Sequence, residues 1–280
     1  MSAVSAEVIR RHSLASEGLA FAAQMLIAVS VEVGDDVGRG FFSQHGTPQG
    51  IADARQVVSF EAAHGFWVEP AWQLFFQHTH HFLAFTLTWP NAARLMNGVY
   101  IGGHIFVTLG VALWLYFCRR KYFALWRNTL ILANALALFV YESFPVAPPR
   151  LTTNLIFNHH LFTFQDTVFG LLQSGQKFVG TSGAGYNEFS AMPSVHMAWA
   201  LLAGLALVLL ARPVWAKAFG VVYPIIMLVA VVVTGNHYLL DAVGAAFVLV
   251  GAFFAALIIE RYKSRIQWPW RGRQPSPVGQ

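Results

Sequence analysis

Charged residues and cysteines are both scarce in this sequence. Asp, Glu, Lys and Arg make up 11% of its 280 residues, while hydrophobic residues make up 56%. A soluble domain carries about 25% charged residues, so the composition excludes an ordinary soluble protein and indicates an integral membrane protein. The single cysteine, Cys118, excludes a disulfide within the chain and is expected to be structural. We expect an uncleaved first span, because Glu32 follows the first apolar stretch and no small-residue cleavage site stands out.

Long stretches without charge are abundant. A helix needs about 20 apolar residues to cross a bilayer. Six stretches approach or reach this length, the first being the shortest: about 18–33, 97–117, 126–143, 194–211, 217–234 and 238–259. They predict an all-α integral membrane protein, a bundle of six transmembrane helices. We expect residues 1–96 to hold the first span and an extracytoplasmic segment, residues 97–260 the main bundle, and residues 261–280 a disordered basic tail.

The basic residues between the stretches predict an orientation. With six spans, four basic clusters fall on one side: Arg10 and Arg11; Arg119, Arg120, Lys121 and Arg127; Arg212 and Lys217; and Arg261, Lys263, Arg265, Arg271 and Arg273. Basic loops stay in the cytoplasm, so we expect a bacterial-type inner or plasma membrane with both termini cytoplasmic. This pattern accounts for the net charge of +5 without a nucleic acid partner.

An aromatic stretch, residues 56–89, falls on the opposite, extracytoplasmic side. Its Phe and Trp residues are interleaved with glutamates and histidines. Such a stretch suits an amphipathic helix in the headgroup layer, where aromatic rings settle. It suits equally a hydrophobic lid packed over the bundle, and both interpretations stay open.

Two polar motifs stand at the edges of the last apolar stretches. They are Ala191-Met192-Pro193-Ser194-Val195-His196 and Gly235-Asn236-His237-Tyr238-Leu239-Leu240-Asp241. The predicted topology brings both motifs to the extracytoplasmic side. Pro193 is expected in the first turn of span four, whose free N–H groups and positive dipole end attract a phosphate.

The three ionisable residues of these motifs predict a reaction. His237 and Asp241 are four residues apart and are expected on one face of span six. Asp241 can then accept a hydrogen bond from one ring nitrogen of His237, which leaves the other nitrogen free to attack. His196 would protonate the leaving oxygen. These residues could instead be helix caps and interhelical contacts only. Ionisable groups within spans are costly and usually functional, so their coincidence favours a phosphoryl-transfer site.

The motifs resemble a known family. Pro193-Ser194-x-His196 and His237-x-x-x-Asp241 resemble the second and third motifs of the type 2 phosphatidic acid phosphatase (PAP2) superfamily. Residues 144–151, Phe-Pro-Val-Ala-Pro-Pro-Arg-Leu, are similar to the proline-rich segment of its inositolphosphotransferase branch, which includes inositol phosphorylceramide synthase. The resemblance covers about residues 97–259. It implies a six-helix bundle, a mechanism without metal or cofactor, a phosphohistidine at His237 and an acid at His196.

One departure from the phosphatase branch concerns phosphate binding. That branch carries an arginine shortly before the third-motif histidine, whereas Ala230 and Val231 stand here. The phosphate charge must then be met by Arg150, Lys177, Ser194 or backbone N–H groups. Arg150 is our first choice, because a guanidinium fork matches phosphate oxygens. The missing arginine favours the phosphotransferase-like branch.

Other candidate sites are weaker. His78-x-His80-His81 and His159-His160 lack accompanying cysteines or a regular carboxylate, so we expect loop or interfacial histidines and no metal site. The glycine-rich stretch 180–185 lacks a Lys-Ser ending and is expected to be a hinge. The remaining polar residues are expected to be a satisfied interhelical histidine, His104, and solvated or capping charges, Glu61, Glu69 and Glu142.

The sequence therefore predicts an enzyme that removes or transfers a phosphoryl-linked group on a lipid at the extracytoplasmic face. Its partners are the bilayer and a lipid phosphate or phospholipid. Hydrolysis and transfer to an alcohol both stay open, since the choice depends on access through residues 34–96 and 151–190. The alternative is a transporter or flippase-like bundle with the histidines as a proton relay, which would need charged or broken helices across the midplane. The intact histidines and aspartate argue against an inactive scaffold.

Overall fold

The structure is a computed structural model, and it describes residues 47–82, 85–152, 154–168 and 189–263. The predicted first span, the glycine-rich stretch with Lys177 before it, and most of the basic tail lie outside the described residues. The helices of the bundle are α4 (Trp89–Asn97), α5 (His104–Cys118), α6 (Arg120–Ser143), α7 (Val195–Leu210), α8 (Val214–Val233) and α9 (Leu239–Lys263).

Within the described residues, four helical stretches are long and apolar enough to cross a membrane: Trp89–Cys118, Arg120–Ser143, Val214–Val233 and Leu239–Tyr262. The first is longer than predicted, because α4 continues through a π-helical turn, Gly98–Gly103, into α5. It begins earlier because Thr88 is extended and a proline occupies the first turn. The predicted span 194–211 is a helix of only 16 residues, α7. These helices make the protein an integral membrane protein.

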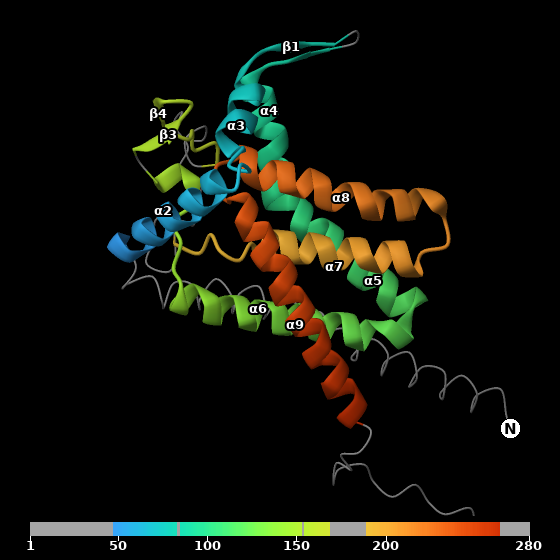
Figure 1. The fold of residues 1–280 in the computed structure, drawn as a ribbon. Coiled ribbons are helices and arrows are strands. Elements are labelled where there is room, and N and C mark those ends of the chain that lie inside the picture. The colour runs from blue at the N-terminus through green and yellow to red at the C-terminus, as the bar shows by residue number, and fades with distance from the viewer. Residues whose placement is uncertain (1–46, 83–84, 153, 169–188, 264–280) are drawn as a thin grey trace, which may run out of the picture.

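Close helix packing forms the bundle. In Figure 1, α7 and α8 run side by side, and α9 crosses α6. Gly204 on α7 faces Gly220 on α8 so closely that a Cβ at either position would clash with the carbonyl oxygen of the other. Small residues permit this approach of two backbones. Large apolar side chains such as Phe106, Phe139 and Phe247 point outward, as expected for helices surrounded by lipid.

The aromatic stretch folds over one end of the bundle. It forms α2 (Thr47–Ala63), α3 (Glu69–Gln77) and a hairpin of β1 (His80–His81) and β2 (Thr86–Leu87), with His80 opposite Leu87. The helices α2 and α3 lie at the end of the bundle where α9 begins, and the hairpin projects away from it (Figure 1). A second hairpin, β3 (Leu155–Phe157) and β4 (His160–Phe162), pairs Leu155 with Phe162 near the same end.

The two interpretations of residues 56–89 each describe part of this segment. Gln73 of α3 is fully buried and donates a hydrogen bond to the carbonyl oxygen of Val233, the last residue of α8, at 3.0 Å. This helix therefore packs on the bundle as a lid. Phe75, Phe82 and Phe85 are more than half exposed, which is the arrangement expected of rings in a headgroup layer. The segment is not one continuous helix, because the chain turns at Gly65 with a φ of +75°.

Candidate active site

His237 lies in the turn between α8 and α9. The turn needs a glycine, since Gly235 has a φ of +73°. The backbone N–H of His237 donates to the carbonyl oxygen of Val231 at 3.1 Å, which ties the histidine to the end of α8. The prediction that His237 and Asp241 share a helix face is therefore wrong: α9 begins at Leu239, so only Asp241 is helical.

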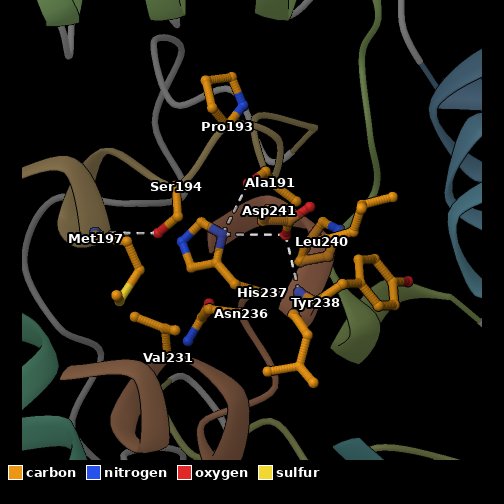
Figure 2. Close-up of polar contacts among 12 residues, drawn as sticks. Ala191, Pro193, Ser194, Met197, Val231, Asn236, His237, Tyr238, Leu240 and Asp241 are labelled. Carbon is orange, nitrogen blue, oxygen red and sulfur yellow. Dashed lines mark hydrogen bonds and ion pairs between the residues drawn. The ribbon is translucent and has the colours of Figure 1, made fainter. Parts of the chain in front are cut away.

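Two acceptors meet the Nδ1 atom of His237, as Figure 2 shows. The carbonyl oxygen of Ala191 lies 2.7 Å away, and Asp241 Oδ2 lies 3.3 Å away. Because both partners only accept, Nδ1 carries the proton and Nε2 keeps its lone pair. Asp241 is fully buried and also accepts the backbone N–H of Tyr238 at 2.8 Å. Its side chain is thus fixed by the first turn of its own helix.

His196 lies in the first turn of α7. Ser194 is the N-cap of this helix, and its Oγ accepts the backbone N–H of Met197 at 3.3 Å. Pro193 therefore precedes the cap and does not stand in the first turn as predicted. The N–H of Ser194 donates to the carbonyl oxygen of Asp241 at 3.1 Å, so the starts of α7 and α9 are joined directly.

The two histidines approach each other across this junction. The ring centroids of His196 and His237 are 5.9 Å apart. Tyr100 stacks on His196 with centroids 4.1 Å apart, and the His104 ring meets His196 edge-on at 4.4 Å. His104 is buried and its Nδ1 donates to the carbonyl oxygen of Tyr100 at 2.8 Å. His104 is hydrogen-bonded, as expected. It also contacts His196 directly and so lies in the candidate site.

Tyr100 lies in the π-helical turn Gly98–Gly103 and His104 directly follows it. Such turns occur frequently at functional sites, because one extra residue shifts the side chains that follow it around the helix. The sequence signal for His104 was the presence of a histidine within an apolar stretch that contains no charged residue. No sequence signal marked Tyr100 or the carbonyl group of Ala191.

The proline-rich segment runs beside residues 189–191, which lead into Pro193 and Ser194. Val146 donates its N–H to the carbonyl oxygen of Phe189 at 2.9 Å, and Ala191 donates to Val146 at 3.1 Å. The segment ends in a short helical turn, Pro149–Leu151. Its Arg150 side chain is buried, donates from Nε to Asn236 Oδ1 at 3.0 Å, and pairs through Nη1 with Asp166 at 3.5 Å. Arg150 therefore contacts the residue immediately before His237.

A family model described as PAP2 superfamily matches residues 56–255, most of the chain. The chain belongs to the PAP2 superfamily. The match extends well before residue 97, so α2 from Gln56 onward and α3 are part of the PAP2 region and not an appendage to it. A search of curated proteins finds no match. The crystal structure of Aquifex aeolicus LpxE is similar over 67% of this chain and 93% of its own, with 16% identity and a TM-score of 0.40.

Two predicted histidine clusters of this PAP2 protein lie in or beside the two hairpins. His80 and His81 are in the first hairpin, and His159 and His160 are exposed at the second, where His159 has a φ of +65°. Over the described ranges, no group of three or more His, Cys, Asp or Glu side chains is arranged to hold a metal ion. The predicted phosphate-binding residue Ser194 caps α7, while Lys177 lies outside the described residues.

Proposed function

We propose that this PAP2 protein is a lipid phosphatase or phosphotransferase that works through a phosphohistidine at His237. The observation that carries the proposal is the pair of acceptors on Nδ1, at 2.7 and 3.3 Å. They hold the proton on that nitrogen and leave the Nε2 lone pair on the opposite side of the ring (Figure 2). A nucleophile held in one tautomer by a backbone carbonyl and a buried carboxylate has the support that covalent catalysis requires.

The first step forms the phosphohistidine. The Nε2 lone pair attacks the phosphorus atom, and the bond from phosphorus to the leaving oxygen breaks. Protonated His196 gives its proton to that oxygen, and its place beside His237 suits this role. The imidazole ring gains positive charge as the bond forms, and the Asp241 carboxylate stabilises that charge through Nδ1–H.

The second step regenerates the enzyme. Neutral His196 takes a proton from water, whose oxygen attacks phosphorus, and the bond between phosphorus and Nε2 breaks. Hydrolysis results if water attacks. Transfer results if an alcohol takes the place of water, as the similarity to the inositolphosphotransferase branch favours.

Phosphate oxygens are held by Arg150 and by the first turn of α7. The Arg150 guanidinium contacts Asn236, next to the nucleophile, and its planar fork suits phosphate. The N-terminus of α7 contributes N–H groups and the positive end of its dipole. Lys177 is the second candidate for a cationic side chain that binds the phosphate. The transporter alternative is less well supported, because no Asp, Glu, Lys or Arg interrupts residues 195–211 or 218–240.

A product assay tests the proposed function. The purified protein is offered lipid phosphates and phosphoinositides, with and without acceptor alcohols, and the products are identified by mass. We expect inorganic phosphate, or a transferred headgroup when an alcohol is present, and no product from a His237→Ala control. Two results would contradict the proposal: turnover by His237→Ala equal to that of the wild type, or no turnover of any phosphorylated lipid by the wild type.

We also propose that the site faces away from the cytoplasm, because the basic links between spans lie at the other end of the bundle. In a Cys118→Ser background, a cysteine at exposed Thr79 should react with a membrane-impermeant thiol reagent in sealed right-side-out vesicles. A cysteine at exposed Lys121 should react only after the vesicles are opened. The reverse pattern would place the site inside.

A further inference from the structure

The first turn of α9 has an unusual set of hydrogen-bond partners. The first backbone N–H groups of a helix have no partner within it. Here the N–H of Leu239 donates to Glu69 Oε1 at 2.7 Å, and the N–H of Leu240 donates to Glu61 Oε1, also at 2.7 Å. Together with the bond from Tyr238 to Asp241, three carboxyl groups occupy the N-terminus of the helix that carries Asp241.

The two glutamates come from far away in the chain. Glu61, on α2, lies 179 residues before Leu240, and Glu69, on α3, lies 170 residues before Leu239. Both residues are fully buried. Burying a carboxyl group costs free energy unless its oxygens accept hydrogen bonds. The hydrogen bonds from α9 reduce this cost for Glu61 and Glu69. The positive end of the α9 dipole stabilises the same carboxyl groups further.

The geometry also favours a proton between the two glutamates. Their second oxygens, Glu61 Oε2 and Glu69 Oε2, are buried and find no donor in the part of the chain that the structure describes. The two glutamates accept from the N–H groups of consecutive residues, Leu239 and Leu240, so their carboxyl groups lie side by side, where a hydrogen bond between them would satisfy both second oxygens. Such a bond needs a hydrogen on one carboxyl group, because ionised carboxylates only accept. Two like charges in buried contact cannot both persist, so one shared proton leaves the pair with a single negative charge.

We propose that Glu61 and Glu69 are positioning residues for the active site: as a pair sharing one proton, they cap α9 and fix where Asp241 stands against His237. This inference rests on the proposed function of His237 and Asp241. The pair holds Leu239 and Leu240, two of the three residues between His237 and Asp241. It therefore sets the position at which Oδ2 meets Nδ1 of His237.

Displacement of a catalytic group by about 1 Å can cost about 100-fold in rate, so a loosened α9 cap should lower kcat more than it raises KM. The positioning role therefore predicts a change in kcat in addition to a loss of stability. It also assigns the lid helices a task in the reaction, since α2 and α3 are the elements that supply the carboxyl groups.

Glutamine substitutions test the shared proton. In Glu61→Gln or Glu69→Gln, the amide oxygen accepts the α9 N–H and the amide nitrogen supplies the hydrogen to the remaining carboxylate. We expect each single variant to unfold at a Tm no lower than that of wild type and to keep kcat within about threefold of wild type, because an amide reproduces a carboxylic acid's donor and acceptor. Glu142→Gln, at an exposed position, is the matched control and should change neither value.

The double variant is the decisive comparison. With Glu61→Gln and Glu69→Gln together, two donor NH₂ groups face each other. We expect a lower Tm and a loss in kcat of at least about tenfold, with a smaller change in KM. An effect equal to the product of the two single effects would overturn the shared proton. Wild-type kcat in folded Glu61→Ala and Glu69→Ala proteins would overturn the positioning role. If the wild type converts no phosphorylated lipid, the proposed function fails, and the non-additive Tm still tests the pair.

Discussion

The Nδ1 atom of His237 lies closer to the backbone carbonyl oxygen of Ala191, at 2.7 Å, than to Asp241, at 3.3 Å. The backbone carbonyl group of Ala191, just before Pro193 and Ser194, therefore holds the tautomer of His237. A mutation cannot remove this carbonyl, so the tautomer survives substitution of the aspartate. Asp241 is left with two other tasks: it supplies negative charge beside the imidazole ring and accepts the N–H of Tyr238.

Asp241→Asn should therefore be less damaging than the loss of a tautomer-setting aspartate. We expect kcat to fall by about 10²-fold, below the roughly 10⁴-fold loss that follows from a wrong tautomer in a serine protease triad. Asp241→Ala should lose stability as well, about 1 kcal/mol, because the N–H of Tyr238 loses its acceptor. Steady-state kinetics and Tm measurements on both variants check this. A loss of 10⁴-fold or more in folded Asp241→Asn would show that Ala191 does not hold the ring.

His196→Ala should slow the reaction by about 10²–10⁴-fold on a natural lipid phosphate, as expected for loss of a general acid. The loss should be smaller on an aryl phosphate, whose leaving oxygen needs no proton. Tyr100→Phe serves as the control, because it keeps the ring that stacks on His196. The measurement is kcat/KM for each variant on both substrates. An equal loss on the two leaving groups would assign His196 another role.

Arg150→Ala should weaken turnover more than Arg150→Lys, which keeps the charge without the planar fork. Asp166→Asn separates phosphate binding from structure, because it removes the ion-pair partner of Arg150 and leaves the guanidinium in place. We expect Asp166→Asn to change kcat and KM less than either arginine variant. If Arg150→Ala left both constants near wild type, another group, Lys177 first, would hold the phosphate.

The stability of the protein should fall as pH rises. Burial, and then the neighbouring Glu69 carboxyl group, raise the pKa of Glu61 from 4.5 to about 10. The titratable groups that interact with it include Glu69 on α3, Tyr238 just before α9 and Asp241 on α9. Between these two pKa values the folded state holds a proton that the unfolded chain releases, so the free energy of unfolding decreases with rising pH. Thermal unfolding in detergent between these limits measures the slope. Glu61→Gln should flatten it, whereas Glu142→Gln should not; an equal slope in all three proteins would be inconsistent with a protonated Glu61.

Apolar runs predicted most of the bundle, and two short motifs predicted that His196, His237 and Asp241 lie close together. A run without charge has few alternatives to a buried or lipid-facing helix, which is why five of the six predicted stretches fall on helices within the described residues. The motif residues are brought together because the starts of α7 and α9 meet, through the bond from Ser194 to Asp241.

Other features had no sequence signal of this kind. Ala191 contributes a carbonyl group, which every residue possesses, so its side chain carries no information. The π-helical turn at Gly98–Gly103 looks like ordinary apolar helix in the sequence, yet it places Tyr100 against His196. Glu61 and Glu69 could be described as capping charges, but which helix they cap depends on contacts across at least 170 residues.

The phosphohistidine is the central claim, and its direct test is to trap it and map it. The protein is mixed with a lipid phosphate that carries a heavy oxygen isotope in its phosphoryl group, quenched in alkali, digested and analysed by mass. The account predicts an acid-labile, alkali-stable phosphoryl group on the imidazole of His237, absent from His237→Ala and retained in Glu142→Gln. A phosphoryl group on another residue such as Ser194 or His196, or turnover with no phosphoenzyme on the reaction path, would contradict it.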